Sequence, residues 1–258
     1  MEWITLFNKE MLEHWRNFKW IWVPLVLILL AIMDPITTYY LPVILENVGG
    51  LPEGAMFEIP ELLPVEALMM SLAQLSSLGV LVIVLMSMGT IAGERKSGVA
   101  ELILVKPIRY LNYITAKWSA LLLIVWVSLT LALSTSWYYI NLLFGELSFT
   151  DLLLTIFFYG LWFSFVITLV IFFSVISRSP GLVAAFTIIT TIAMSIITSL
   201  FGKHLTWSPS NMSGHIEYAI VSQELTKDLM MTGLITLILI GILIVGAQQI
   251  FIRKEQIN

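Results

Sequence analysis

The chain has 258 residues, of which 59% are hydrophobic and only 12% charged, and its mean hydropathy is +0.94. A soluble domain of this size would not contain so much apolar surface, so the composition indicates an integral membrane protein. Cysteine is absent, which excludes a disulfide framework, a thiolate nucleophile and a cysteine metal site.

A membrane-spanning helix needs about 20 apolar residues. Six segments meet this requirement, at about 20–41, 68–92, 115–141, 152–178, 181–201 and 229–251. Their apolar runs are continuous rather than alternating, as expected for helices. We therefore predict an all-α membrane protein whose residues 1–258 form one transmembrane domain.

The basic residues lie almost entirely on one side of the predicted membrane. Eleven of the thirteen fall before span one, between spans two and three, between spans four and five, or after span six, and only Lys203 and Lys227 fall on the other side. By the positive-inside rule, both termini are cytoplasmic. The pattern predicts a multi-pass protein of the plasma membrane.

Residues 1–19 carry Trp3, Phe7, Met11, Trp15 and Phe18 at helical spacing. Charged residues occupy much of the remaining surface. This pattern predicts an amphipathic helix in the inner membrane interface. It serves either as a cap for span one or, in addition, as a contact for a partner.

Span one contains the pair Asp34-Pro35. The proline should kink or end the helix. A carboxylate within a membrane is costly and is a candidate for a functional site. The alternative is that the helix ends at Pro35 and that Asp34 meets outer water.

Span five carries a stripe of hydroxyl side chains at intervals of four residues, namely Thr187, Thr191, Ser195 and Ser199. Together with Asp34, these are our candidates for a translocation path. The stripe is equally compatible with hydrogen bonds between helices or back to the helix itself. The loop 202–228 that follows is expected to contain a short external helix within 217–225.

The segment 93–117, between spans two and three, holds five of the thirteen basic residues. Val99, Leu102 and Ile103 have the i, i+3, i+4 spacing of one helix face, and Pro107 ends this element. The apolar face is expected either to lie in a groove on a partner or to pack under the chain's own helices.

Catalytic motifs are missing. Gly93–Gly98 resembles the first half of a phosphate-binding loop, but Val99-Ala100 replaces the lysine and hydroxyl that phosphate and magnesium require. The three histidines, His14, His204 and His215, lie outside the spans. We expect no enzyme activity, no metal site and no cofactor in this chain.

The run ERKSGVAELILVKPIR, with a lysine eight residues later, resembles the loop between spans two and three of ABC type-2 exporter permeases. The matching positions, in order, are Glu94, Gly98, Leu102, Leu104, Pro107, Arg109 and Lys117. The predicted N-terminal helix, the six spans and the external helix are also similar to that family.

The resemblance implies a permease that pairs with a second copy or a paralogue. Cytosolic ABC ATPase subunits would bind ATP and magnesium and dock on the N-terminal helix and on a coupling helix between spans two and three. The ATPase-coupling residues would be Glu94, Arg95, Gly98, Glu101, Leu102, Pro107, Arg109 and Lys117. Nucleic acid is not an expected partner.

Two other function classes stay open from the residues alone. One is an ion-coupled secondary transporter that uses Asp34, and the other is a membrane protein that binds a cytosolic partner without transport. The sequence does not indicate the substrate.

Overall fold

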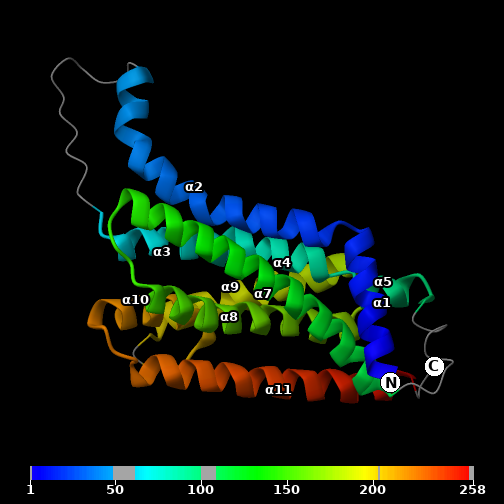
Figure 1. The fold of residues 1–258 in the computed structure, drawn as a ribbon. Coiled ribbons are helices and arrows are strands. Elements are labelled where there is room, and N and C mark those ends of the chain that lie inside the picture. Colours follow the sequence, from blue (N-terminus) through cyan, green and yellow to red (C-terminus); the bar gives the residue numbers. More distant parts are fainter. Residues whose placement is uncertain (1, 49–61, 100–108, 203, 256–258) are drawn as a thin grey trace.

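The computed structural model describes residues 2–48, 62–99, 109–202 and 204–255, and these fold into a bundle of helices with no strand among them (Figure 1). The predicted all-α class with six spans is confirmed. The helices long and apolar enough to cross a membrane are Lys19–Leu45, Pro64–Lys96, Tyr110–Leu143, Phe149–Ile176, Pro180–Leu200 and Lys227–Arg253.

The first two helices, α1 (Glu2–Arg16) and α2 (Lys19–Val48), meet at a sharp turn. Phe18 sits in this turn with φ of 54°, a left-handed conformation that bulky residues seldom adopt. As a result, α1 crosses the ends of the spans while α2 runs along them (Figure 1).

The second span is assembled from several helical pieces. It contains α3 (Pro64–Gln74), the π-helical turn η1 (Leu75–Gly79), α4 (Val80–Ser87) and α5 (Ala92–Lys96). The later elements are α7 (Tyr110–Leu143), α8 (Phe149–Ile176), α9 (Pro180–Leu200), the 3₁₀ turn η2 (Pro209–Asn211), α10 (Met212–Ser222) and α11 (Lys227–Glu255). The short helix expected within 217–225 thus begins earlier and ends at Ser222.

Of the two alternatives for span one, the one in which the helix ends at Pro35 is wrong. Pro24, Pro35 and Pro42 all lie inside one continuous helix. A proline removes only one helix hydrogen bond, so the helix bends and continues, and Figure 1 shows α2 curving away from the bundle in its second half. Asp34 therefore stays inside the helix, where its carboxylate accepts a hydrogen bond of 3.1 Å from Gln74 Nε2.

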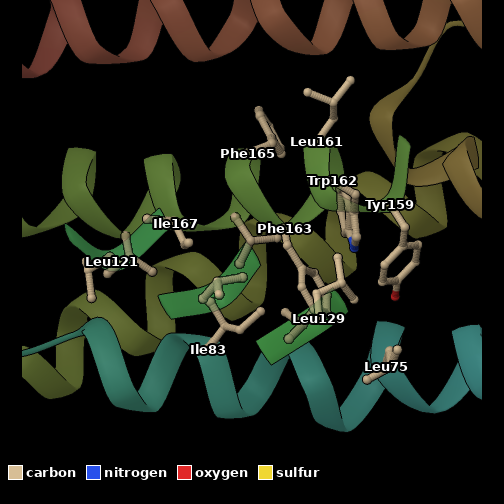
Figure 2. Close-up of a cluster of buried hydrophobic side chains, with 14 of the residues drawn as sticks. Leu75, Ile83, Leu121, Leu129, Tyr159, Leu161, Trp162, Phe163, Phe165 and Ile167 are labelled. Atoms are coloured by element: carbon tan, nitrogen blue, oxygen red, sulfur yellow. The ribbon is translucent and has the colours of Figure 1, made fainter. Parts of the chain in front are cut away.

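The central helix is α8. It packs against α4, α7, α9, α10 and α11, and it is the most buried of the candidate spans, with 72% of its most apolar window buried. Figure 2 shows Phe163 of α8 projecting toward the side on which Leu129 of α7 and Ile83 of α4 lie. All three side chains are fully buried.

The contact between α7 and α8 depends on a glycine. A methyl group added at Gly160 would lie 2.7 Å from the Trp126 ring. The Trp126 indole N–H also donates to Ser164 Oγ at 3.0 Å, which holds the ring over the glycine. Small residues at helix contacts let helices approach closely in membranes.

Gly160→Ala should therefore destabilise the bundle by about 1–3 kcal/mol, because the added methyl group overpacks a rigid contact. The matched control is Gly241→Ala, since an added methyl group there meets no atom within 4 Å. Thermal unfolding in detergent measures both variants. A melting temperature lowered equally in both would contradict the packing argument.

Candidate functional site: a charge cluster between α1, α5 and α7

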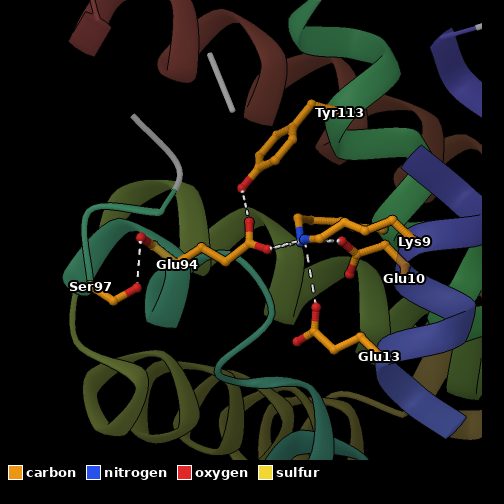
Figure 3. Close-up of polar contacts among 7 residues, drawn as sticks. Lys9, Glu10, Glu13, Glu94, Ser97 and Tyr113 are labelled. Atoms are coloured by element: carbon orange, nitrogen blue, oxygen red, sulfur yellow. Dashed lines mark hydrogen bonds and ion pairs between the residues drawn. The ribbon is translucent and has the colours of Figure 1, made fainter. Parts of the chain in front are cut away.

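Charged side chains from three elements meet at the end of the bundle that α1 crosses (Figure 3). The set, which we call the charge cluster, consists of Lys9, Glu10 and Glu13 of α1, Glu94 of α5, and Tyr113 and Lys117 of α7. These elements are far apart in the sequence, so the cluster exists only in the folded chain.

Lys117 is the most buried charge of the cluster, with 1% of its surface exposed. Its ammonium group donates to Glu10 Oε1 at 2.7 Å and forms an ion pair with Glu94 Oε1 at 2.9 Å. It also lies 5.2 Å from the centre of the Tyr113 ring, an attractive position for a cation. A buried ammonium group is tolerated because carboxylates surround it.

Glu94 joins all three elements. One of its carboxylate oxygens contacts Lys9 of α1 at 2.6 Å and Lys117 of α7 at 2.9 Å. The other oxygen accepts a hydrogen bond of 2.6 Å from the Tyr113 hydroxyl. One carboxylate therefore ties α5 to both α1 and α7.

The cluster is an ion-pair network rather than a metal centre. Oxygen atoms of Glu10, Glu13 and Glu94 lie within 4.8 Å of one another, a spacing that metal ligands can have. However, the ammonium groups of Lys9 and Lys117 already contact these oxygens. A divalent cation would have to displace both lysines.

Further contacts hold α1 in place. The Trp3 indole N–H donates to Thr115 Oγ1 of α7 at 3.1 Å. The Lys19 ammonium, at the start of α2, donates to the carbonyl oxygen of Met86 at 2.9 Å. With the charge cluster, these bonds fix α1 against α7 and against the end of span two.

Two α1 side chains have pKa values shifted in opposite directions. Burial opposes the charge of Lys9, but the hydrogen bond to Glu94 and the nearby carboxylates outweigh it and raise the pKa above its ordinary range. Burial, together with the positive charges of Lys19, Lys117 and Lys9, lowers the pKa of His14 to about 3. Neither ring nitrogen of His14 has a hydrogen-bond partner among the described residues.

The depressed His14 pKa predicts a loss of stability in mild acid. An unfolded histidine takes up a proton near pH 6.5, whereas the folded protein keeps His14 neutral until about pH 3. The unfolded chain binds more protons between these values, so stability falls as pH is lowered through 6.5. His14→Phe should reduce the drop in melting temperature between pH 7.5 and pH 5.5.

The exposed His204, which lies outside the charge cluster, provides the control for the removal of a histidine elsewhere in the chain, through His204→Phe. If His14→Phe and the native protein lose the same stability between the two pH values, His14 is not the responsible group.

The predicted coupling residues are only partly described. Glu101, Leu102, Leu104 and Pro107 lie outside the described residues. Arg109 is exposed at the start of α7, and Gly98 has φ of +77°, a conformation that favours glycine.

Arg95 does not project freely from the surface. It is 7% exposed, donates to the carbonyl oxygen of Val175 in α8, and lies 5.4 Å from the centre of the Phe251 ring. Its observed contacts are therefore internal ones.

The candidate path residues divide into two groups. Thr187 and Thr191 are buried, and their hydroxyls donate to backbone carbonyls of α9 itself. Ser195 and Ser199 are exposed near the other end of α9, and Ser199 also bonds its own helix. The structure does not bring these residues together with Asp34 into one described cavity.

Four members of the cluster, Lys9, Glu10, Glu13 and Tyr113, were not among the site residues predicted from the sequence. The residues of α1 that turn inward are Leu6, Glu10 and His14, while Trp15 and Phe18 of the predicted apolar stripe are largely exposed. Glu10 shares the four-residue spacing of Leu6 and His14, which was the available signal. No local pattern marks Tyr113.

With six helices that are long and apolar enough to cross a membrane, the chain is a polytopic membrane protein. The model of the ABC-2 family of transporter proteins matches residues 4–232, so the chain belongs to this family. It is also similar to the uncharacterized transmembrane protein YxlG of Bacillus subtilis (strain 168), with 32% identity over 221 residues, or 86% of each chain.

Proposed function

We propose that the chain is the membrane-spanning permease subunit of an ATP-driven ABC exporter, with ATP hydrolysed by a separate ATPase subunit. The observation that supports this most is the ion pair between Glu94 and Lys117. Both positions belong to the pattern of ABC type-2 permeases, and the pair joins the end of span two to the start of span three.

The charge cluster supplies the coupling step of this proposal. ATPase subunits would dock on α1 and on the loop that follows α5, with both termini in the cytoplasm of the cell. Closure of the ATPases on ATP and magnesium would then move α1 and α5, and Glu94 and Lys117 would pass the movement to α7. A second permease copy or a paralogue would complete the path for an unidentified substrate.

The test is ATP hydrolysis by the assembled complex. The permease and its ATPase are copurified and placed in lipid nanodiscs, and the rate is compared with that of the ATPase alone. We expect the permease to raise the rate, and substitution of the phosphate-binding lysine of the ATPase to abolish it. Failure to copurify with any ABC ATPase, or a rate that does not depend on the permease, would overturn the proposal.

Orientation has a separate test, made simple by the absence of cysteine. Ser97→Cys, in the exposed residues after α5, should react with a membrane-impermeant thiol reagent only after the membrane is opened. Ser222→Cys, at the end of α10, should react in intact cells. The reverse pattern would invert the proposed topology.

Ion-coupled transport through Asp34 is less well supported. Its carboxylate already has a partner in Gln74 on the neighbouring helix. Transport that persists in Asp34→Asn but stops without ATP would exclude this alternative.

A further inference from the structure

A small polar cavity lies between spans two, four and five, apart from the charge cluster. Its volume is about 50 Å³. The residues that line it come from η1, α8, α9, η2 and α10, and they are Ser76, Tyr159, Trp162, Ser195, Pro209, Ser210, Met212 and Ser213. None of these lining residues is charged.

The floor of the cavity is formed by two aromatic side chains of α8. Tyr159 is 1% and Trp162 is 5% exposed, and Figure 2 shows both projecting from α8 in the same direction. The Tyr159 hydroxyl donates to the carbonyl oxygen of Leu72 at 3.2 Å, so the 2.8 Å contact with Ser76 is donated by the serine. Tyr159 is thereby held against the π-helical turn, a type of irregularity frequent at functional sites.

Several polar groups of the cavity have no hydrogen-bond partner among the residues that the structure describes. The Trp162 indole N–H and the hydroxyls of Ser195 and Ser213 make no hydrogen bond within the described part of the chain. The Trp162 side chain is only 5% exposed, but its indole N–H is not among the fully buried polar atoms that lack a partner, so it remains accessible from the cavity. The cavity therefore offers a donor and two hydroxyls to a ligand.

The wall opposite α8 is firmly built. The hydroxyls of Thr198, Ser208 and Ser210 form a closed ring of hydrogen bonds of 2.7, 3.0 and 2.9 Å. This ring ties the end of α9 to η2. Ser210, which lines the cavity, is thus held in position by this ring.

The cavity is accessible from the surface between spans two and five. Ser76 and Ser195 are its exposed lining residues, on spans two and five. Beside them, Leu78 is 42% and Ile192 is 53% exposed, and both lie further along their spans toward the middle of the bundle. Exposed apolar side chains therefore lie within three residues of the polar lining residues on both spans.

We propose that this cavity binds the uncharged, hydroxyl-bearing head of an amphiphile whose apolar tail lies along Leu78 and Ile192. The indole N–H of Trp162 donates to an oxygen of the head, and a head hydroxyl donates to Ser195 or Ser213. The volume accepts a head of one or two hydroxyl groups and excludes a large sugar. This site goes beyond the proposed function, because it needs no ATPase.

Native mass spectrometry of the purified permease in detergent micelles with 1-monooleoylglycerol tests the site. We expect a saturable adduct whose dissociation constant rises about three- to tenfold in Trp162→Phe, which keeps the ring and removes the N–H donor. Ser195→Ala should weaken binding in the same direction. Since only the permease is present, the result does not depend on coupling to ATP hydrolysis.

The control variant is Ser77→Ala, because Ser77 lies on the same π-helical turn but bonds its own helix and does not line the cavity. Its affinity should equal that of the native protein. Two further probes test whether both the head and the tail are needed. Glycerol is a free polyol without a tail, and 1-octadecene is a tail without a polar head. Neither should bind. Equal binding of either probe, no saturable adduct, or equal affinities in the native protein, Trp162→Phe and Ser195→Ala would overturn the proposal.

Discussion

Lys117→Met should destabilise the protein more than any other single change in the charge cluster. The substitution leaves the carboxylates of Glu10 and Glu94 without the ammonium group that lies 2.7 and 2.9 Å from them. Removing one partner of a buried ion pair costs about 3–5 kcal/mol, because the remaining charge stays buried and uncompensated. We expect a clearly lower melting temperature in detergent.

The double variant Lys117→Met with Glu10→Met separates this cause from a general loss of packing. Buried ion pairs replaced by apolar residues of similar volume are often as stable as the original pair. The double variant should therefore recover much of the stability that the single variant loses. A double variant that melts well below the single variant would show that the ion pair is not the source of the loss.

Glu94→Ala should have the second largest effect, on assembly rather than on folding alone. It removes the carboxylate that bonds Lys9, Tyr113 and Lys117 at once, so α5 is no longer tied to α1 and α7. We expect the tagged permease to retain at least about tenfold less ATPase. A loss of about 1.4 kcal/mol in binding free energy is enough to lower the affinity tenfold. The melting temperature of the permease alone should be recorded in parallel.

Glu13→Ala provides the matched control. Glu13 belongs to the same cluster, but its side chain is 47% exposed and its contact with Lys9 is 3.6 Å long. An exposed pair of this kind contributes little to stability. ATPase retention should therefore stay close to that of the native protein, and retention unchanged in Glu94→Ala as well would remove Glu94 from the coupling pathway.

The π-helical turn belongs to span two, and the polar cavity lies between span two and its neighbours. The charge cluster includes Glu94, near the other end of span two. Span two therefore contributes to both features, through Ser76 at the cavity and Glu94 in the cluster. Under the proposed function, a movement of α5 would reach the cavity along one segmented helix.

Several predictions from the sequence hold because they depend on composition and length. A run of about 20 apolar residues has few stable conformations other than a membrane-spanning helix, so the six spans follow from the hydropathy alone. The curvature of α2 agrees with the prolines inside it, each of which lacks the N–H of a helix hydrogen bond. Whether the helix ends at Pro35 depends on the residues beyond it, which continue α2 to Val48.

The sequence by itself determined the membrane class, the segments that span, and the loop whose residues match the ABC-2 family. It did not determine which charges are internal, because ion pairs form between residues that are distant along the chain. Only the tertiary structure decided that Lys117 is buried against Glu10, that Tyr113 bonds Glu94, and that Trp162 faces a polar cavity. The physical reason is that burial and pairing of polar groups arise from helix packing, which local periodicity does not contain.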